Sequence, residues 1–420
     1  MIATLDLRNM KGEIDAIASK SHAHRALIAA SLANKPTKLL LNSTSNDIKA
    51  TADCLKAAGA VIENDDLNLT VSPIDKSANE AVFDCGESGS TIRFLIPVAA
   101  ALGINSVFTG CGRLPERPQA PLLNALSKHG VTVSPEGEFP IKISGQLQSG
   151  VFTIAGNISS QYVTGLLFAL PLLDGDSEIR LIPPVESKPY IDMTVAVLKE
   201  FGVEVSEQGN SYFIKGNQKY ISPETVKIDG DWSNGAFYVA FGAVSDIKIN
   251  GLFPDSVQGD REIINIIKSM GADVQLNENS ISVSKNELHG IDIDVKNTPD
   301  LVPVIATTAV FAKGQTKIYN AGRLRLKESD RLATVTQIIR SAGGDIEELP
   351  DGLIINGGNP IKESFTVDAE NDHRLVMAAA VLASHSVVTV KNAQSINKSY
   401  PAFFEDLRKL GGKCDVINDR

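Results

Sequence analysis

Residues 51–71 read TADCLKAAGAVIENDDLNLTV, an amphipathic helix that ends at Gly59 and passes into two short strands. Glycine can adopt the left-handed conformation that closes a helix without a Cβ clash, so the chain can leave the helix axis there. The pattern returns at intervals of roughly seventy residues, which indicates a repeated local fold. The further copies are LLNALSKHGVTVSPEGEFPIKI (122–143), MTVAVLKEFGVEVSEQGNSYFI (193–214), IINIIKSMGADVQLNENSISV (263–283), TVTQIIRSAGGDIEELPDGLII (334–355) and FFEDLRKLGGKCDVIND (403–419), centred on Gly130, Gly202, Gly271, Gly343 and Gly411.

These six units predict a compact α/β protein. Each is longer than an ordinary solenoid repeat and contains two helical stretches and several strands. A chain of 420 residues is too long for one hydrophobic core, and six similar units divide naturally into two domains of three. We therefore expect a two-lobed α/β fold.

Composition excludes several classes of protein. A formal net charge of −10 argues against a general nucleic-acid binder, which needs a basic field. The four cysteines are far apart and form no CxxC pair, which indicates neither a zinc site nor a disulfide framework. The N-terminus shows no signal sequence, and no apolar run reaches membrane-spanning length without a charge or turn residue. These features predict a cytoplasmic protein with reduced cysteines and no membrane partner.

A second, more apolar helix is expected in each unit. These stretches are apolar on nearly all sides, so they should be buried inside their lobes. In chain order they are HRALIAASLA (24–33), IRFLIPVAAAL (92–102), YVTGLLFALPLL (162–173), AFYVAFGAV (236–244), LVPVIATTAVFA (301–312) and RLVMAAAVLAS (374–384).

Polar residues gather just before these apolar helices. Taken singly, the Ser, Thr, Asn and Asp residues there are ordinary helix N-caps. Taken together, six helix N-termini that converge at one end of each lobe would favour anions, through free N–H groups and helix dipoles. The openings are 19–21 (SKS), 86–91 (GESGST), 159–161 (SSQ), 231–234 (DWSN), 298–300 (TPD) and 371–374 (NDHR).

Cations at these openings strengthen the anion-site hypothesis. Ser21 and Arg25 are four residues apart and share a helix face, with Lys20 at the start of the same helix. Arg93 follows the glycine-rich turn, whereas Arg117 stands beside two prolines and fits a loop or a ligand contact about equally well.

Two histidines of the first opening point to no metal site. His22 and His24 are two residues apart, so they lie on different sides of the helix. We therefore expect both to be structural.

The densest charged cluster is RLRLKESDR (323–331). Its alternation predicts a strand that leads into a helix cap, and a solvated charged face is the competing interpretation. Lys327 beside Glu328 offers an acid–base pair whose pKa values a cleft could separate. Asp300, Arg374 and Lys398 add further charged groups to the second half of the chain.

The motifs SKSHAHRA, GESGSTIRFL, ERP, SSQY, SKPYID, GDWSNGAFY, TPD, LRLKESDR, NDHR and NKSYP occur in the order found in the EPSP synthase family, which the chain resembles over essentially its whole length. The resemblance implies two lobes, each of three βαβαββ-type units, with helix N-termini that face the cleft between them. It also implies that the chain crosses between lobes near residues 19 and 229. We then expect residues 1–18 with 229–420 to carry most acid–base groups, and 19–228 to bind shikimate 3-phosphate.

The resemblance implies a reaction between phosphoenolpyruvate and shikimate 3-phosphate, through a tetrahedral intermediate, in a monomer without metal or cofactor. Asp300 is the expected base for the 5-hydroxyl, Glu328 or Lys327 the acid at C3, and Lys20 a further catalytic group. The motifs assign shikimate 3-phosphate to Lys20, Ser21, Arg25, Ser159, Ser160, Gln161, Ser187, Tyr190, Asp300 and Lys327. They assign phosphoenolpyruvate to Lys20, Gly89, Arg117, Gln161, Arg331, Arg374 and Lys398.

The chain departs from the family pattern at a few positions. Ile17 and Ala18 stand where Pro-Gly is usual, Glu87 stands for Asn in the glycine turn, and Ser90 stands for Thr. Because Glu87 adds negative charge near an expected anion site, we expect its side chain to point away or to pair with an arginine.

Two alternatives remain at this point. One is the related enolpyruvyl transferase that acts on UDP-N-acetylglucosamine with a loop cysteine, for which Cys111 is the candidate, although its spacing to Arg117 is one residue off. The other is a non-catalytic anion-binding scaffold, since a fold alone does not prove activity. Inactivation by alkylation of Cys111 would favour the first.

Overall fold

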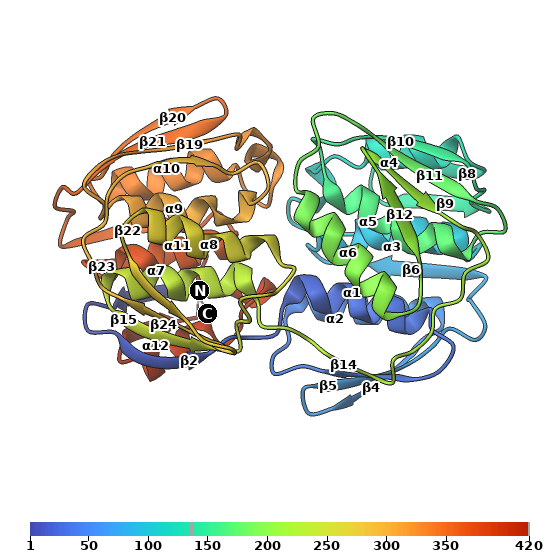
Figure 1. Cartoon of the computed structure of the whole chain (residues 1–420), viewed down its shortest axis with the longest axis horizontal. Coiled ribbons are helices and arrows are strands. Elements are labelled where there is room, and N and C mark those ends of the chain that lie inside the picture. The colour runs from blue at the N-terminus through green and yellow to red at the C-terminus, as the bar shows by residue number, and fades with distance from the viewer. Residues whose placement is uncertain (135–137, 419–420) are drawn as a thin grey trace. The chain divides into compact units, whose positions relative to one another are not determined.

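The computed structural model describes residues 1–134 and 138–418, which divide into two compact units (Figure 1). The continuous unit spans Lys20–Ile228. The discontinuous unit combines Met1–Ser19 with Asp229–Arg420, so the chain leaves it once and returns. The roles expected for the two halves of the chain, binding and acid–base chemistry, stay predictions.

The continuous unit has three four-stranded sheets within its described residues. Each sheet has one parallel strand pair and two antiparallel pairs. In spatial order they are β14 (Thr225–Lys227), β3 (Thr37–Leu40), β5 (Asn68–Ser72) and β4 (Val61–Asp65); β6 (Glu80–Asp84), β7 (Asn105–Thr109), β9 (Ile141–Gly145) and β8 (Val131–Ser134); β10 (Val151–Ala155), β11 (Ser177–Ile182), β13 (Ser211–Ile214) and β12 (Val205–Gln208).

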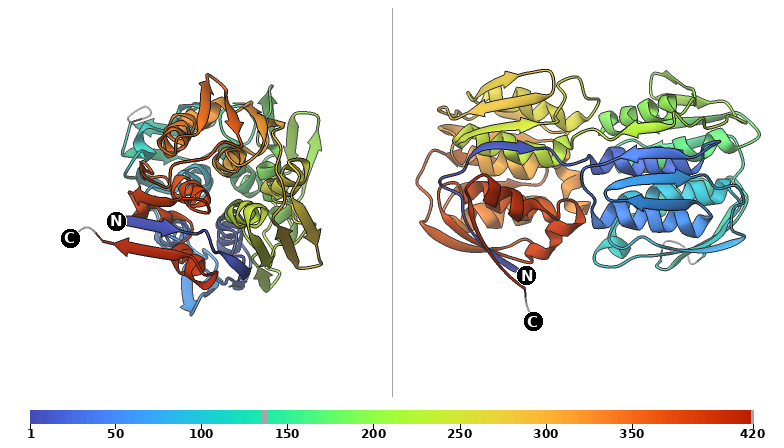
Figure 2. Two further views of the ribbon diagram at one scale, coloured as in Figure 1. Left: turned by 90° about the vertical axis from the view of Figure 1, so that its left-hand side faces the viewer. Right: turned by 90° about the horizontal axis from the view of Figure 1, so that it is seen from below.

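The discontinuous unit repeats this arrangement in three sheets of its described residues. Its first and last strands lie side by side and pair antiparallel (Figure 2). The sheets are β22 (Ser364–Asp368), β23 (Val387–Lys391), β1 (Ile2–Asp6) and β24 (Lys413–Ile417); β16 (Asp273–Leu276), β17 (Ser280–Ser284), β15 (Asp246–Asn250) and β2 (Lys11–Asp15); β18 (Asp292–Asp294), β19 (Gly314–Tyr319), β21 (Gly352–Gly357) and β20 (Asp345–Leu349).

Two helices accompany each sheet, which confirms the predicted α/β repeat. In the part of the chain that the structure describes, no helix is both long and apolar enough to span a membrane. The α-helices are α1 (Lys20–Ser31), α2 (Asn46–Ala58), α3 (Gly89–Ala101), α4 (Ala120–Ser127), α5 (Ser160–Ala169), α6 (Lys188–Glu200), α7 (Trp232–Val244), α8 (Ile263–Ser269), α9 (Val302–Ala309), α10 (Arg331–Ser341), α11 (His373–Leu382) and α12 (Phe403–Lys409). Short 3-10 helices are η1 (Leu114–Glu116), η2 (Leu170–Leu172), η3 (Gly259–Glu262), η4 (Pro299–Leu301), η5 (Gly322–Leu326) and η6 (Ala393–Lys398).

The glycines that mark the repeat adopt the predicted left-handed conformation. At Gly59 a Cβ atom would also lie only 2.7 Å from the carbonyl oxygen of Lys76, so no other residue fits there without movement. The φ angles are 116° at Gly59, 86° at Gly130, 73° at Gly202, 109° at Gly271, 85° at Gly343 and 90° at Gly411. The helix-to-strand step of each unit therefore rests on the same backbone geometry.

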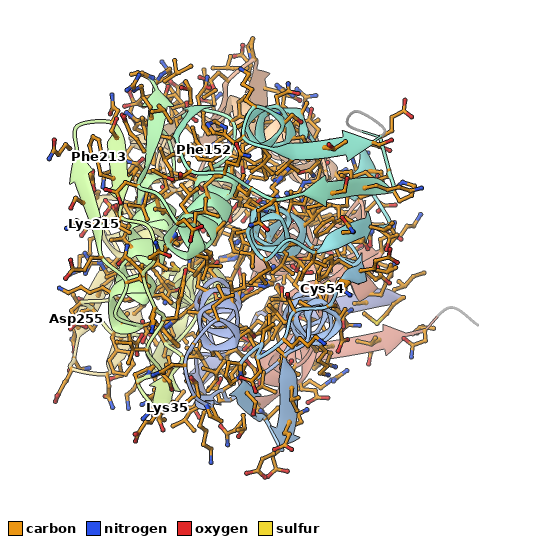
Figure 3. The ribbon with its side chains drawn as sticks, turned by 90° about the vertical axis from the view of Figure 1, so that its right-hand side faces the viewer. Lys35, Cys54, Phe152, Phe213, Lys215 and Asp255 are labelled. Atoms are coloured by element: carbon orange, nitrogen blue, oxygen red, sulfur yellow. The ribbon has the colours of Figure 1, made fainter. Side chains whose placement is uncertain are left out.

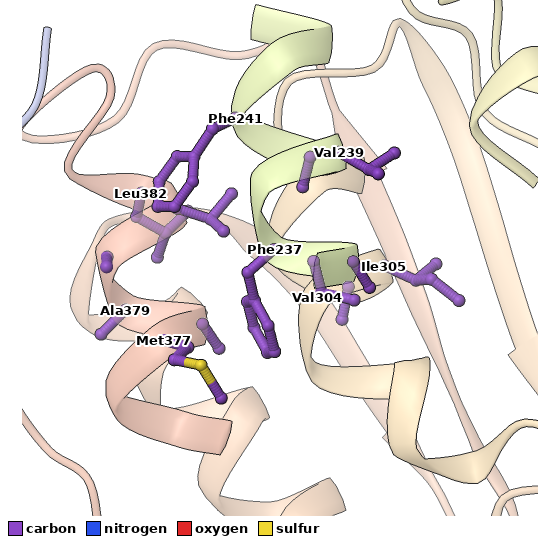
Figure 4. Packing of buried hydrophobic residues seen from close by; sticks show 14 of the residues in the cluster. Phe237, Val239, Phe241, Val304, Ile305, Met377, Ala379 and Leu382 are labelled. Carbon is purple, nitrogen blue, oxygen red and sulfur yellow. The ribbon is translucent and has the colours of Figure 1, made fainter. Parts of the chain in front are cut away.

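The apolar helices form the cores, as predicted. In the discontinuous unit α7, α9 and α11 pack together through side chains such as Phe237, Ile305 and Met377, all at most 1% exposed (Figure 4). In the continuous unit α1, α3 and α5 are likewise buried over most of their length. Because these helices are buried on all sides, the side chains of their polar first turns are the ones that can contact a ligand.

The sheets cover these cores with alternating side chains. In the sheet of β10 to β13, Phe152 points inward and is fully buried, whereas Phe213 is 39% exposed (Figure 3). This alternation is what the pleat of a half-buried strand requires.

The strand predicted before α10 is wrong, because residues 322–326 form the 3-10 helix η5. In a strand Leu324 and Leu326 would lie on one face. Instead Leu324 is fully buried and Leu326 is 49% exposed, since the turn separates the two side chains. The backbone N–H of Gly322 donates to the Asp351 carboxylate, and Arg323 donates to the carbonyl of Lys296, which hold the turn against neighbouring loops.

Candidate active site

Several polar residues that open the buried helices act as N-caps. The side chains of Ser88, Ser159, Asp231 and Asp372 each accept a hydrogen bond from a backbone N–H of the first turn. Capping is therefore confirmed as one role of these openings, and a ligand role has to rest on the charged groups beside them.

Arg25 is a buried cation of the continuous unit, only 3% exposed. Its guanidinium lies 5.2 Å from the ring centre of Phe94. It donates to the hydroxyls of Thr194 (2.9 Å) and Thr164 (3.4 Å) and to the carbonyls of Ser21 (2.7 Å) and Tyr190 (2.9 Å). None of these partners is charged.

Burial lowers the pKa of Arg25 to about 9, which still leaves the guanidinium protonated at neutral pH. A buried cation without a carboxylate partner is costly, so this arrangement favours the arrival of an anion.

Lys20 pairs with Asp47, which the sequence analysis did not single out. The Lys20 ammonium lies 2.8 Å from the Asp47 carboxylate, and the two side chains are 16% and 14% exposed. Asp47 stands in the first turn of α2, behind the N-cap Ser45, where the helix dipole favours a carboxylate. The cap motif was visible in the sequence, but its contact with Lys20 depends on how α1 and α2 pack.

Arg93 orients Gln161. The guanidinium donates to the Gln161 side-chain oxygen at 2.7 Å, and the Gln161 amide donates in turn to the Ser90 hydroxyl at 2.9 Å. Arg93 also donates to Gln119 at 3.2 Å and to the carbonyl of Pro118 at 3.0 Å. The motif of residues 159–161 and the glycine turn are thereby joined in one network through Arg93, which the motif-based assignment left out.

The glycine turn and Arg117 come together in the structure. A Cβ atom built on Gly89 would lie 2.7 Å from a terminal nitrogen of Arg117, which is itself 7% exposed. A larger residue at this helix N-terminus would require the Arg117 guanidinium to move. In the same turn, the Glu87 side chain lies against Gly112, where an added Cβ would clash with it, so it is turned toward the loop after β7.

The other predicted binding residues of the continuous unit stand at the ends of α1, α5 and α6. Ser21 and Ser160 are half-buried in the first turns of α1 and α5. Ser187 precedes α6 in a left-handed conformation with φ of 57°, and Tyr190 is half-buried one turn later, where its carbonyl contacts Arg25. Arg25 and Tyr190 are thus brought together directly.

Asp300 of the discontinuous unit lies among three cations. Its carboxylate is 2.9 Å from Arg331, 3.0 Å from Arg374 and 3.5 Å from Lys327. Burial alone would raise the pKa of the Asp300 carboxyl, but Arg374, Lys327 and Arg331 together hold it well below its usual range. Asp300 is therefore ionised, and its basicity is weak as long as these cations remain paired with it.

Arg331 is the centre of this cluster and is only 1% exposed. It donates to Asp300 at 2.9 Å, to Glu328 at 2.7 Å and, through Nε, to the fully buried Asp372 at 2.7 Å. Burial would lower the pKa of Arg331, but the three carboxylates raise it. In the sequence Asp372 stands only within the opening of residues 371–374, and the structure makes it the buried partner of Arg331.

The two candidate acids have different surroundings. Partial burial lowers the pKa of Lys327 to about 8, against the opposing effect of Asp300. Glu328 is held by the guanidinium of Arg331. Both remain candidates for proton transfer.

Arg374 and Lys398 complete the predicted cations of this unit. Arg374 donates to both a side-chain and the main-chain oxygen of Asp300, at 3.0 and 3.3 Å. Lys398 is 7% exposed, and its ammonium donates to the carbonyl of Asn371, at the start of α11. The predicted residues of the discontinuous unit thus lie close to the starts of α9, α10 and α11, with Lys398 at the end of η6.

Solved structures with this fold are known. A structure of EPSP synthase from Acinetobacter baumannii superimposes with a TM-score of 0.83 at 23% identity, covering 99% of this chain and all of that one (100%). The enolpyruvyl transferase NikO from Streptomyces tendae gives 0.79 at 17% identity, covering 99% and 98% of the two chains. These likenesses agree with the predicted fold class.

Sequence comparison gives the family. Among similar relatives, proteins named 3-phosphoshikimate 1-carboxyvinyltransferase from Clostridium novyi (strain NT) and Brachyspira hyodysenteriae (strain ATCC 49526 / WA1) are 41% and 42% identical to this chain. Those alignments cover 97% and 98% of this chain and 96% and 99% of the relatives. The family model described as EPSP synthase (3-phosphoshikimate 1-carboxyvinyltransferase) matches residues 6–407. The chain belongs to the EPSP synthase family.

Proposed function

We propose that the chain transfers the carboxyvinyl group of phosphoenolpyruvate to the 5-hydroxyl of shikimate 3-phosphate and releases phosphate, as a step of aromatic amino-acid biosynthesis. The observation that carries the proposal is the cluster in which Asp300 lies among Arg331, Arg374 and Lys327, with Glu328 beside it. The reaction needs a carboxylate base, a proton donor and cations for an anionic substrate, and this cluster contains all three.

We assign shikimate 3-phosphate mainly to the continuous unit. Arg25 supports this assignment because it is a buried cation whose contacts are all neutral, and an anionic substituent would satisfy its charge. Hydroxyl and amide groups around it suit a polar ring. The proposed residues are Lys20, Ser21, Arg25, Ser159, Ser160, Gln161, Ser187 and Tyr190, with Asp300 and Lys327 at the reacting hydroxyl.

We assign phosphoenolpyruvate to Lys20, Gly89, Arg117, Gln161, Arg331, Arg374 and Lys398. Arginine forks match carboxylate and phosphate oxygens in pairs. Because Arg331 and Arg374 already contact Asp300, an arriving anion has to compete with that carboxylate for them. Binding would then weaken the cationic surroundings of Asp300 and raise its proton affinity at the moment when a base is needed.

The proposed reaction has two stages. Asp300 takes the proton of the 5-hydroxyl while the oxygen attacks C2 of phosphoenolpyruvate, and Glu328 or Lys327 gives a proton to C3. The tetrahedral intermediate then returns the C3 proton, the C2–C3 double bond forms again, and the C2–O bond to phosphate breaks. Cations stabilise the charge that moves between the carboxylate, phosphate and attacking oxygen.

The direct test is release of inorganic phosphate from phosphoenolpyruvate, with and without shikimate 3-phosphate. We expect release only in its presence. Release with UDP-N-acetylglucosamine instead would refute the proposal. Relatives that are named 3-phosphoshikimate 1-carboxyvinyltransferase and are 41% identical to the chain support it.

A second test concerns Asp300. We expect Asp300→Asn to lower turnover far more than it weakens the binding of shikimate 3-phosphate. Equal loss of both would remove its role as base.

From the family resemblance we further propose that the protein works in the cytoplasm as a monomer. Light scattering after size-exclusion chromatography would check the monomer, for which a mass near 44.8 kDa is expected.

A further inference from the structure

Four buried side chains form a chain of hydrogen bonds inside the continuous unit. His24 Nδ1 lies 2.7 Å from the Thr51 hydroxyl, Thr51 lies 2.7 Å from the Thr91 hydroxyl, and Thr91 donates to the Ser88 hydroxyl at 2.7 Å. All four residues are at most 1% exposed. The chain runs from α1 through α2 to the turn that opens α3, and none of its members was a predicted site residue.

The proton positions in this chain follow from counting donors. Thr91 donates its single hydroxyl proton to the Ser88 hydroxyl. The contact between Thr51 and Thr91 therefore needs the Thr51 proton, which leaves none for the histidine. With Thr91 as the donor to Ser88, the contact between His24 and Thr51 is completed by a proton on Nδ1 of His24.

The other ring nitrogen of His24 agrees with this tautomer. Nε2 is buried and has no hydrogen-bond partner, and the ring meets Phe94 edge-on, with the two ring centres 6.3 Å apart. Burial lowers the pKa of His24 well below its usual value, and the nearby charges of Lys20 and Arg25 act in the same direction. The imidazole is neutral, with its proton on Nδ1.

The two ends of this hydrogen-bond chain lie beside the two groups of residues that are proposed to bind the substrates. α1 carries Lys20 and Arg25, whereas Ser88 is the N-cap that directly precedes Gly89. Gly89 leaves room for the Arg117 guanidinium, so a small shift of this turn would close that space.

We propose that His24 is a positioning residue of the enzyme, whose Nδ1–H, passed on through Thr51 and Thr91, holds the Ser88–Gly89 turn in the geometry that accepts phosphoenolpyruvate. The proposal rests on the proposed function and deepens it. The hydrogen-bond chain should affect the affinity for phosphoenolpyruvate, because its far end shapes the turn beside Arg117. It should not affect shikimate 3-phosphate, because the contacts of Arg25 include none of the four side chains.

The kinetic test compares variants that keep or break the donor. Thr51→Val removes the hydroxyl without changing shape, and His24→Leu removes the donor at the start of the chain. Each leaves a buried hydrogen-bonding group unsatisfied, so we expect the KM for phosphoenolpyruvate to rise roughly tenfold. The dissociation constant of shikimate 3-phosphate should stay within about twofold. His24→Asn keeps an N–H near the Nδ1 position and should restore the wild-type KM.

Thr307→Val is the matched control. Thr307 is also fully buried, but its hydroxyl donates only to carbonyls of its own helix, at Pro303 and Val304. It should lose stability without a change in either substrate constant. A Thr51→Val enzyme that melts earlier but keeps its KM for phosphoenolpyruvate would reduce the chain to a structural role and overturn the proposal. The same holds if His24→Asn behaves like His24→Leu.

The tautomer gives a readout that does not depend on activity. In two-bond proton–nitrogen NMR spectra of the full chain, assigned by the signal that His24→Asn removes, His24 should show a protonated Nδ1 and a bare Nε2 at neutral pH. A protonated Nε2 would overturn the proposal. If the wild-type protein released no phosphate from its proposed substrates, the proposed function would fail, while this spectrum would still test the hydrogen-bond chain.

Discussion

Replacement of Arg25 by methionine should separate the stability of the continuous unit from its ligand binding. Methionine is close to arginine in length and carries no charge. The guanidinium is 3% exposed and contacts only neutral oxygens, so the folded protein bears the cost of a buried charge. Its removal should relieve that cost and remove the anion site at the same time.

The size of the effect follows from the pKa. Burial lowers the pKa of Arg25 from an ordinary 12.5 to about 9. At 1.36 kcal/mol for each pKa unit, the charged form is disfavoured by about 5 kcal/mol in the folded state. Both folded and unfolded forms are protonated at pH 7, so this full cost applies there and disappears only as the pH rises through the range from 9 to 12.5.

Lost hydrogen bonds offset part of the gain. Thr194 still donates to the Tyr190 carbonyl at 3.0 Å and contacts the Thr164 hydroxyl at 2.9 Å, so these acceptors stay satisfied. We expect Arg25→Met to raise the free energy of unfolding by about 1–3 kcal/mol. Binding of shikimate 3-phosphate should weaken by about ten- to a hundredfold, the worth of a charge-assisted hydrogen bond.

The assay is urea denaturation with two probes. Trp232, the only tryptophan of the chain, reports the discontinuous unit by fluorescence, whereas circular dichroism reports both units. The dichroism transition should move to higher urea concentration, and calorimetric titration should show the weaker binding. Destabilisation by more than about 1 kcal/mol would mean that Arg25 supports the fold through its hydrogen bonds. An unchanged dissociation constant would refute its place in the ligand site.

Three further predictions concern the discontinuous unit and the rival reaction. Asp372→Asn keeps the cap of α11 but breaks the buried pair with Arg331, so it should lower the free energy of unfolding in urea by about 3 kcal/mol. Asp330→Asn is the control, because Asp330 caps α10 and forms only a part-exposed pair; it should lower that free energy by under about 1 kcal/mol. Equal losses in the two variants would contradict the prediction. Because the pKa of Lys327 is about 8, kcat/KM should fall above that pH as the ammonium loses its proton. Lys327→Arg should move this alkaline limb of the pH profile to higher pH. A limb that stays in place would mean that another group titrates there. Cys111 is the exposed cysteine, so Cys111→Ser and maleimide labelling should leave most phosphate release intact, whereas inactivation would favour the cysteine-dependent transferase.

Local features of the chain were predictable because they depend on residues a few positions apart. The left-handed conformation of Gly59 and its equivalents, the burial of the apolar helices and the caps at Ser88 and Asp372 follow from backbone sterics, periodicity and first-turn hydrogen bonds. The order of short motifs then carried the resemblance to the family, which the comparisons confirmed.

The strand expected over residues 323–326 failed for the opposite reason. Alternation in four residues cannot distinguish a strand from a 3-10 turn, and the contacts of Gly322 and Arg323 with distant loops decided it.

The repeat, the buried helices, the family and the types of residue that open each helix are legible in the amino-acid order alone. Which of those residues come into contact depends on how the helices pack. Asp372 and Arg331 are 41 residues apart, His24 and Thr51 are 27 apart, and Lys20 and Asp47 are also 27 apart. Such pairs form only when helices pack, since hydrogen bonds and ion pairs require contact at about 3 Å. That packing makes Asp300 an ionised carboxylate among cations, Arg25 a buried charge with neutral partners and His24 the first member of a buried hydrogen-bond chain.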